Sequence, residues 1–513
     1  MRRIGIDVGG TNTDAVLMDG DRILSSIKTS TTMDVFSGIR KALNHVLMDL
    51  APAEQDTIHA VMIGTTHFTN AVVERRSLAR VASVRIGLPA ASTILPMQGW
   101  PEDLHSRLDG GSYLIKGGHE FDGRQIVPFD REAMVEAARA IAKSGVRSIA
   151  ITSVFSPINA ECELEAEAIL QEIVPDATVT LSCHLGRIGL LERENATILN
   201  SALHPLARET VDAFKKAIAE SGLKAPLFLT QNDGTVMQSE QAAQYPVRCF
   251  ASGPTNSMRG ARMLSGLDDA VVLDIGGTTT DAGFLQNGFP REANSKVDIG
   301  GVATFFPMPD VMAVALGGGT IIRQDGARIG PDSVGYRMTE KARVFGGDTL
   351  TLSDFAVKTG LMSFGEPQSV EDLDPAILER VSAWINQTLG DLVDRMKTSA
   401  ADVPVIVVGG GAALAPDHID GVSTVIKVEN AGVANAVGAA MAQVSGEVDK
   451  VYYDMSRDEA LDAARLLAED RAIEAGADAT SLKLIDIEDA PLSYMPGNPL
   501  RIRIRLVGNL GLI

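Results

Sequence analysis

The sequence predicts an α/β protein built from two lobes. An eight-residue phrase at 7–14 returns 267 residues later, at 274–281, with six of its eight positions identical. Apolar segments of strand length alternate with amphipathic segments of helix length around both copies, as in α/β domains. The chain, at 513 residues, is also longer than one hydrophobic core usually supports. We therefore expect two lobes of similar plan, each carrying one copy of the phrase.

Each copy is predicted to form a β-hairpin, because a Gly-Gly pair lies between two apolar runs. A glycine pair at a hairpin tip lets backbone N–H groups approach a ligand, since no Cβ stands in the way. Threonine hydroxyls add donors for phosphate oxygens, whereas aspartate repels phosphate and is suited to Mg²⁺. One copy alone could be an ordinary tight turn. A turn does not need the repeated threonine and aspartate, so the two copies predict a site that holds phosphates from two sides.

The predicted phosphate-binding residues are Gly9, Gly10, Thr11, Asn12, Thr13, Gly276, Gly277, Thr278, Thr279 and Thr280. We expect Asp7 and Asp274 to hold Mg²⁺ and, with Asp281, to act in catalysis. A third glycine turn, Gly409-Gly410-Gly411, follows an apolar strand at 403–408. Its exposed backbone could let an adenine or a ribose lie against it.

Two further polar residues are candidates for catalysis. His67 follows the predicted strand 60–63 and could carry a proton, face a substrate or cap a helix. Glu192 begins a long helical stretch and could be an active-site carboxylate or a surface charge. The general base stays open among Glu192, Glu194, His67 and Asp233.

The chain divides into three predicted parts. Residues 1–265 form the first lobe, with an inserted subdomain of mostly β or irregular structure at about 80–130. Residues 266–446 form the second lobe. Residues 447–513 form a small α+β appendage, and the alternating arginine and apolar residues at 501–506 predict a half-exposed strand there.

The sequence also predicts three helices at particular places in this division. Helices of small residues are expected from about residue 252 and over 432–444, and they suit close packing between two lobes. A long helical stretch over 189–221 is expected to break at Pro205, because proline removes a helix hydrogen bond.

The net charge and the composition exclude several classes of partner and cofactor. The net charge is −20 and the pI about 4.9, which argues against nucleic acid or an anionic membrane as main partner. The sequence shows no signal peptide or membrane span, so a cytoplasmic protein is expected. Cys162, Cys183 and Cys249 lack metal-type spacing, which disfavours an iron–sulfur centre.

Two Asp-Gly-Gly-Thr hairpins, a late triple-glycine turn and two crossing helices resemble the actin, sugar-kinase and Hsp70 superfamily of ATP-binding proteins. The resemblance implies two ribonuclease H-like lobes with a nucleotide cleft between them. It also implies that the three glycine turns are phosphate loop one, phosphate loop two and the adenosine loop. ATP and Mg²⁺ are the implied cofactors.

Further motifs resemble the hydantoinase/oxoprolinase A family. They are Gly64-Thr65-Thr66, Thr69-Asn70-Ala71, Glu74-Arg75, Asn200-Ser201-Ala202, Gln231-Asn232-Asp233-Gly234, Ser252-Gly253-Pro254, 274–281 and Tyr494-Met495-Pro496-Gly497-Asn498. This resemblance implies ATP-dependent opening of a cyclic amide, such as a hydantoin or 5-oxoproline, or carboxylation of a ketone. An unstrained amide is a poor electrophile, and phosphorylation of its oxygen would create a leaving group.

Departures from the family pattern leave alternatives open. Thr11-Asn12-Thr13 stands where the family commonly has Thr-Phe-Thr, and His67-Phe68 replaces smaller residues. The chain also has nothing resembling the B-type subunit that often completes hydrolysis, so the resemblance implies that this chain performs half of the reaction with a B-type partner subunit. Whether the chain forms a homo-oligomer stays open. The leading interpretation is an ATP-dependent amidohydrolase. The alternatives are an ATP-dependent carboxylase or small-molecule kinase, and a regulatory ATPase that changes its lobe angle to act on a protein partner.

Overall fold

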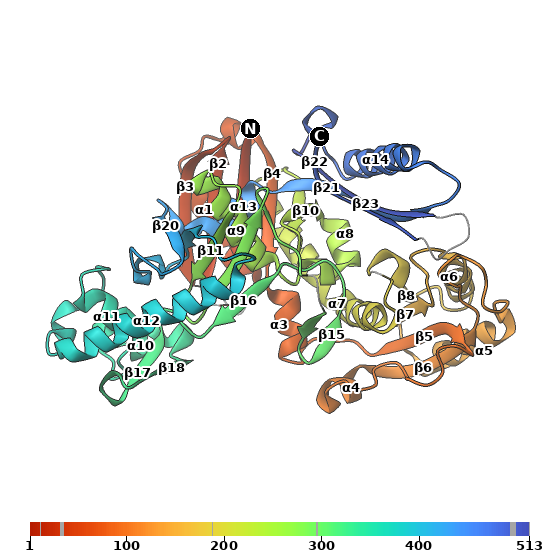
Figure 1. The fold of residues 1–513 in the computed structure, drawn as a ribbon, viewed down its shortest axis with the longest axis horizontal. Coiled ribbons are helices and arrows are strands. Elements are labelled where there is room, and N and C mark those ends of the chain that lie inside the picture. The colour runs from red at the N-terminus through yellow and green to blue at the C-terminus, as the bar shows by residue number, and fades with distance from the viewer. Residues whose placement is uncertain (11, 31–34, 187, 294–295, 493–498, 512–513) are drawn as a thin grey trace.

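The computed structural model describes all residues except 11, 31–34, 187, 294–295, 493–498 and 512–513 (Figure 1). The predicted α/β class is confirmed: one nine-stranded and one six-stranded sheet form the centre of the molecule. We call the part built on the nine-stranded sheet the first lobe and the part built on the six-stranded sheet the second lobe. Within the described residues, no helix combines the length and apolar character needed to cross a membrane.

The nine-stranded sheet has the order β22-β23-β21-β10-β9-β4-β1-β2-β3. Its strands are β1 (Arg2–Val8), β2 (Asn12–Asp19), β3 (Arg22–Ser30), β4 (Ile58–Thr65), β9 (Leu227–Thr230), β10 (Thr235–Gln238), β21 (Gln443–Tyr452), β22 (Lys483–Pro491) and β23 (Leu500–Gly508). The helices of this lobe include α1 (Val35–Leu47), α2 (Pro52–Gln55), α3 (His67–Val73), α7 (Leu190–Glu220) and α8 (Ser239–Gln244).

The six-stranded sheet has the order β13-β12-β11-β19-β20, with β16 paired to β12. Its strands are β11 (Ala270–Ile275), β12 (Thr280–Gln286), β13 (Phe289–Pro290), β16 (Val311–Val314), β19 (Val403–Val408) and β20 (Val422–Lys427). Around it lie β17 (Thr320–Arg323), β18 (Arg328–Ser333), α10 (Met338–Lys341), α11 (Leu352–Lys358) and α12 (Pro375–Met396).

The two lobes share one strand plan. In the first, β1 pairs antiparallel with β2 and parallel with β4, giving the order β3-β2-β1-β4-β9. In the second, β11 pairs antiparallel with β12 and parallel with β19, giving β13-β12-β11-β19-β20. The repeated phrase therefore marks a repeat of topology.

The segment at about 80–130, predicted as an inserted subdomain of mostly β or irregular structure, belongs to a larger parallel α/β unit. Its four strands, in the order β6-β5-β7-β8, are all parallel. The unit comprises β5 (Val81–Leu88), α4 (Glu102–Leu108), β6 (Asp109–Lys116), α5 (Arg131–Ser144), β7 (Ser148–Ser153), α6 (Glu161–Ile173) and β8 (Thr178–Leu181). Parallel strands need long crossovers, so the two strands of the expected insert are completed only by the helices and strands that follow.

The long helix α7 runs through Pro205 without the predicted break. Leu203 and Phe214, on either side of the proline, are fully buried in the core of the first lobe. Apolar burial along the helix outweighs the loss of one backbone hydrogen bond.

The C-terminal segment does not form a sheet of its own. Strand β21 pairs with β10, and β23 and β22 follow it, so the predicted boundary at 446/447 falls inside β21. Helix α14 (Arg457–Glu474) covers this end of the sheet. The strand β23 was predicted to be half-exposed, but Arg503 and Arg505 are buried because acidic side chains surround them.

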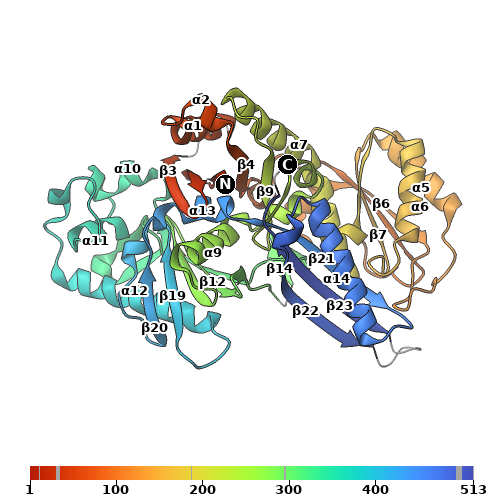
Figure 2. The ribbon, with the colours of Figure 1, turned by 90° about the horizontal axis from the view of Figure 1, so that it is seen from above.

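Two helices carry the chain between the lobes, as predicted. Helix α9 (Ser252–Ser265) leads into β11, and α13 (Ala434–Ala440) leads back into β21; both lie near the centre of Figure 2. A Cβ at Gly438 would lie 1.9 Å from the Asn256 carbonyl oxygen, and one at Gly260 would lie 1.9 Å from that of Ala434. Helix α13 is shorter than the predicted 432–444, because the chain enters β21 at Gln443.

An arm of the second lobe lies on the first. The hairpin of β14 (Val297–Ile299) and β15 (Val302–Thr304) is inserted between β13 and β16. Its Ile299 and Val302 are buried in the core of the first lobe, and it lies beside α3 and α7 in Figure 1. Arg75 Nη2 donates to the Gly300 carbonyl at 2.7 Å and Asn195 Nδ2 to that of Ala303 at 2.8 Å.

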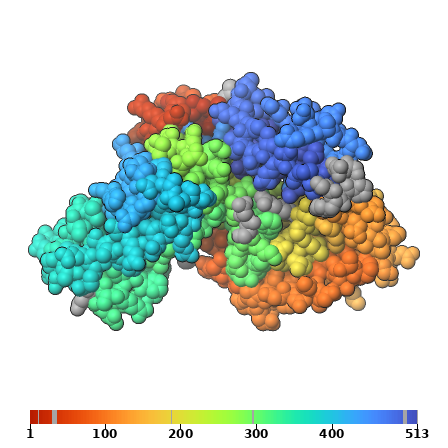
Figure 3. Space-filling model, viewed as in Figure 1, coloured from red at the N-terminus to blue at the C-terminus, as the bar shows by residue number. Residues whose placement is uncertain are grey.

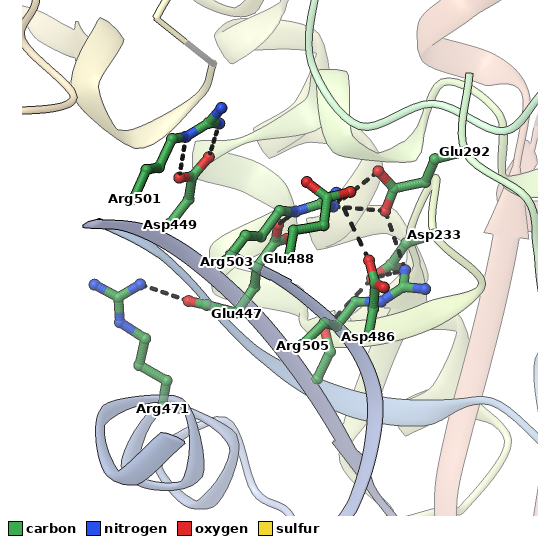
Figure 4. A network of polar contacts seen from close by, with 11 residues as sticks. Asp233, Glu292, Glu447, Asp449, Arg471, Asp486, Glu488, Arg501, Arg503 and Arg505 are labelled. Carbon is green, nitrogen blue, oxygen red and sulfur yellow. Dashed lines mark hydrogen bonds and ion pairs between the residues drawn. The ribbon is translucent and has the colours of Figure 1, made fainter. Parts of the chain in front are cut away.

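A cluster of charges makes a second link between the lobes (Figure 4). Arg503 Nη2 donates to both carboxylate oxygens of Glu292, at 2.8 and 2.9 Å, and Arg505 Nη1 donates to Glu292 at 3.2 Å. Glu292 belongs to the second lobe and the arginines to β23 of the first. We call Glu292, Arg503 and Arg505 the C-terminal latch.

The latch should contribute more to stability than a neighbouring pair within one lobe. Glu292→Gln should lower the free energy of unfolding in urea by about 1–3 kcal/mol, because the pair is nearly buried. The matched control is Asp449→Asn, which breaks the ion pair between Asp449 of β21 and Arg501 of β23. Both of these side chains are about one third exposed. That loss should stay below about 1 kcal/mol. Equal losses in the two variants would contradict this account of the latch.

Candidate active site

The two glycine hairpins are alike in atomic detail. Asp7 lies opposite Asp14 in the β1–β2 pair, and Asp274 lies opposite Asp281 in the β11–β12 pair. At the first tip the Gly9 N–H donates to the Asn12 carbonyl at 3.0 Å; at the second, the Gly276 N–H donates to the Thr279 carbonyl at 2.9 Å. The predicted hairpins are thus present in the same register in both lobes.

The tips differ from their strands in accessibility. Gly10, Gly277, Thr278 and Thr279 are exposed, so their backbone or hydroxyl groups are available to a ligand. Two other predicted phosphate ligands, Thr13 and Thr280, are buried side chains of the strands. The Thr280 hydroxyl donates to the Leu316 carbonyl at 2.7 Å, so it stabilises the hairpin rather than facing a ligand. Thr11 lies outside the described residues, as does the family motif at 494–498.

The predicted carboxylates come together from the two lobes. Burial, followed by the charge of Asp14 and a smaller effect of Asp274, raises the pKa of Asp7 to about 7. Burial and the charge of Asp274 likewise raise the pKa of Asp281 to about 7. Side-chain contacts join the carboxylates of the two lobes: Asn435 Nδ2 donates to Asp7 Oδ2 at 3.4 Å, and Asn435 Oδ1 lies 2.5 Å from the Ser257 hydroxyl, which contacts Asp274.

Lys28 lies beside this group of carboxylates. Its Nζ donates to Asp14 Oδ2 at 2.7 Å and to the carbonyl of Gly432, just before α13, at 3.0 Å. Its charge opposes the rise in pKa that burial causes at Asp14 and Asp274. Lys28 therefore supplies a cation from β3 at the junction of the lobes.

The third glycine turn lies against the second hairpin. The Gly411 N–H donates to the Ile275 carbonyl at 2.7 Å, and the Gly409 N–H donates to that of Ala431 at 2.9 Å. A Cβ at Gly409 would lie 2.3 Å from Asp274 Oδ1, so only glycine allows this approach. The turn and the second hairpin thus form one continuous surface.

Figure 3 shows a notch at the lower edge, between the second lobe and the inserted unit. In Figure 1, β4 runs toward α3, which follows it directly in the chain. Strand β1 pairs in parallel with β4 up to Val8 and Thr65, so both strands end beside the start of α3.

The donor set suits a magnesium ion that is shared with phosphate oxygens. Mg²⁺ usually takes one or two carboxylates and completes its shell with water and phosphate. In the described part of the chain, no group of three or more His, Cys, Asp and Glu side chains is placed to hold a metal by itself. The charge of Asp274 raises the pKa of Asp7, and a bound divalent cation would relieve this repulsion.

The two other predicted catalytic residues differ in position. His67 begins α3 next to the first hairpin, where the Thr66 N–H donates to the Val8 carbonyl at 3.4 Å. Burial lowers the pKa of His67 below 6.5, so its ring is neutral at pH 7. Glu192 pairs with Lys296 beside the arm. Burial opposes ionisation of Glu192, but hydrogen bonds from Lys296 and the backbone outweigh it and lower its pKa.

Two candidates for the general base have structural partners. Glu194 is buried in an ion pair with Arg85, which joins α7 to the inserted unit. Asp233 accepts from the Thr235 backbone at 2.9 Å and closes the turn before β10.

Sequence analysis missed Asp14, Lys28, Asn256, Ser257 and Asn435. Asp14 had a signal, because it occupies the position in the first phrase that Asp281 occupies in the second. The other four reach the carboxylates from β3, α9 and α13, and no local pattern marks them.

The raised pKa values predict how stability depends on pH. Because the pKa of Asp281 rises from 3.8 to about 7, the folded chain binds a proton that the unfolded chain has lost between these values. Without Mg²⁺, the free energy of unfolding should therefore fall as the pH rises through this window, by up to about 1.4 kcal/mol per pH unit for each such group. Urea titrations in EDTA at pH 5 and 8 measure this. The decrease in the free energy of unfolding between pH 5 and pH 8 should be smaller in Asp281→Asn than in the unaltered chain. An equal decrease in the two proteins would show that Asp281 does not cause it.

Comparisons with known proteins agree with the geometry. The family model for the hydantoinase/oxoprolinase N-terminal region matches residues 3–174, and that for hydantoinase/oxoprolinase matches residues 193–364. The caprolactamase subunit alpha of Pseudomonas jessenii is 25% identical in an alignment of 427 positions that covers 77% of this chain and 60% of that protein. The acetone carboxylase beta subunit of Xanthobacter autotrophicus is 25% identical in an alignment of 392 positions that covers 70% of this chain and 54% of that protein.

The fold agrees as well. The crystal structure of the ATP-dependent caprolactamase from Pseudomonas jessenii matches with a TM-score of 0.77 at 18% identity, over 99% of this chain and 88% of that one. The chain spans less than two thirds of the length of both curated relatives. The two family matches together cover more than half of the sequence, and the chain belongs to the hydantoinase/oxoprolinase family.

Proposed function

We propose that this chain is an ATP-dependent enzyme, or the ATP-using subunit of one, that opens a cyclic amide. The observation that carries the proposal is that two equivalent Asp-Gly-Gly hairpins, one from each lobe, have their aspartates joined by the contacts of Asn435 and Ser257. Such a pair can hold the phosphates of one nucleotide from two sides. The triple-glycine turn, which abuts Asp274, is the proposed adenosine side.

Each group has a proposed role. The exposed backbone of Gly10 and Gly277 would bind phosphate oxygens, and Asp7 and Asp274 would hold Mg²⁺. ATP, when bound, supplies the phosphoryl group that makes the amide oxygen a leaving group. Of the four candidates for the general base, His67 fits best, because it is neutral and lies next to the first hairpin. Glu192 and Glu194 are each paired with a cation.

A carboxylase is the second candidate, favoured by similarity to the acetone carboxylase beta subunit. It would bind ATP with the same hairpins, and its substrates would be a ketone and a carboxyl donor. A regulatory ATPase that works by a large change in lobe angle fits less well. The arm and the C-terminal latch both tie the lobes together, and such a motion would have to break them.

A partner subunit is part of the proposal. Both curated relatives are named as subunits, alpha in one case and beta in the other. We propose that a chain of the B type completes ring opening, after this chain has activated the substrate.

ADP release by the purified chain with Mg-ATP tests the proposal. The panel contains hydantoins, 5-oxoproline and caprolactam, with acetone plus bicarbonate as the carboxylase arm. Stimulation by a ring compound, with the opened ring found by mass spectrometry, would support the amidohydrolase. Stimulation by acetone and bicarbonate, with the carboxyl group kept in the product, would favour the carboxylase. Nucleotide binding without stimulation would point to the partner subunit or to a regulatory role.

A further inference from the structure

Three side chains of the crossing helices lie between the aspartates of the two lobes. Asn256 and Ser257 belong to α9, and Asn435 belongs to α13. Asn256 and Ser257 are each 1% exposed, so water cannot take over their hydrogen bonds. The close crossing of the two helices brings them to one place.

At the first-lobe end, two amides hold Asp7. Asn256 Nδ2 donates to Asp7 Oδ1 at 3.2 Å, and Asn435 Nδ2 donates to Asp7 Oδ2 at 3.4 Å. Each oxygen thus has its own donor, which fixes the rotation of the carboxylate. Gly64 of β4 makes room for this arrangement, because a Cβ there would lie 2.0 Å from Asn256 Nδ2.

At the second-lobe end, one hydroxyl holds Asp274. The Ser257 hydroxyl lies within hydrogen-bonding distance of two acceptors, Asp274 Oδ2 and, at 2.5 Å, Asn435 Oδ1, and its single proton is shared between them. Asn435 contacts Asp7 through its nitrogen and Ser257 through its oxygen. A continuous chain of polar contacts therefore runs from Asp7 through Asn435 and Ser257 to Asp274.

We propose that Asn256, Ser257 and Asn435 form an interlobe relay of positioning residues, which sets the orientation of Asp7 and Asp274 so that both lobes hold one metal–nucleotide complex. The inference rests on the proposed function, because it takes these aspartates as the residues that hold the cation of Mg-ATP. Ser257 and Asn435 act in series on the same path. Loss of either one breaks it, and loss of the second then costs little more.

The test measures binding rather than turnover, in the full-length chain. Mn²⁺ replaces Mg²⁺ as a paramagnetic probe, and free Mn²⁺ is followed by electron paramagnetic resonance with a non-hydrolysable ATP analogue present. Ser257→Ala and Asn435→Ala are compared with the double variant. Ser265→Ala is the matched control, because Ser265 is the last residue of α9 and its hydroxyl accepts a local hydrogen bond from the Leu267 N–H at 3.2 Å. Thermal unfolding of each variant is recorded in parallel.

Each relay variant should weaken Mn²⁺ binding about 10-fold, the effect expected of one hydrogen bond to a charged group. The double variant should bind about as weakly as the weaker single variant, far from the product of about 100-fold. Ser265→Ala should bind like the unaltered chain. Losses that multiply, or relay variants that bind like Ser265→Ala, would overturn the relay while leaving the proposed function standing. An unaltered chain that binds no Mn²⁺–nucleotide complex would overturn the proposed function and the relay with it.

Discussion

Asp274→Asn should lower ATP-dependent turnover by at least about 10²-fold, the size of effect seen when one preorganised electrostatic group is removed. The substitution keeps the shape of the side chain and removes the charge proposed to hold Mg²⁺. Asp7→Asn should have a loss of similar size, because the two aspartates occupy equivalent positions in their hairpins. ADP release under saturating Mg-ATP measures both losses.

Stability should move the other way in these variants. Burial raises the pKa of Asp274, so the ionised carboxylate costs folding free energy at pH 8 and a neutral amide should cost less. Urea unfolding should therefore show Asp274→Asn to be at least as stable as the unaltered chain. Asp417→Asn, at an exposed aspartate of the same lobe, is the control and should keep full turnover. Turnover that persists in both Asp7→Asn and Asp274→Asn would refute the site.

Gly438→Ala should be among the most destabilising single substitutions in the chain. The new Cβ would lie 1.9 Å from the Asn256 carbonyl oxygen and 2.7 Å from the Gly260 nitrogen, and both are backbone atoms of α9 that cannot rotate away. Separating the helices should cost about 3 kcal/mol of unfolding free energy, at the upper end for overpacking. The same shift would draw Asn256 and Asn435 away from Asp7, so nucleotide binding should weaken too.

Gly390→Ala provides the control for this prediction. Gly390 lies in α12, where a Cβ would make only ordinary contact, 3.8 Å from Ile419 Cγ2. Alanine there should stabilise the helix by up to about 1 kcal/mol. Urea unfolding of the two variants side by side measures both effects. A Gly438→Ala protein as stable as Gly390→Ala would show that the helices do not pack as closely as described.

Much of this arrangement could be predicted from local sequence. The hairpins, their register and the triple-glycine turn follow from glycine pairs between apolar runs, and the repetition of the phrase indicates a repeated lobe. The strand predicted at 403–408 has these bounds in the structure, as β19, because its run of apolar residues is continuous.

What local sequence could not give are contacts between distant segments. The first residues of β21, Gln443 and Val444, fall within the predicted helix 432–444. They form a strand because they pair with β10, more than 200 residues earlier in the chain. The arginines of β23 alternate as on a solvent-exposed strand, and only the acids that meet them from elsewhere explain their burial. Glu192 resembled an active-site carboxylate because its partner, Lys296, comes from the other lobe.

The most direct test of the central claim follows one oxygen atom. A ring compound that stimulates ADP release is labelled with ¹⁸O at its amide carbonyl, and the released inorganic phosphate is analysed by mass spectrometry, with the partner subunit added if one is needed. If the amide oxygen is phosphorylated, a first water adds to the ring carbon and the C–N bond breaks, which opens the ring to an acyl phosphate. A second water then displaces the phosphate at that carbon, so the phosphate must carry the label. Unlabelled phosphate, with the label retained in the opened product, would contradict phosphoryl activation of the amide.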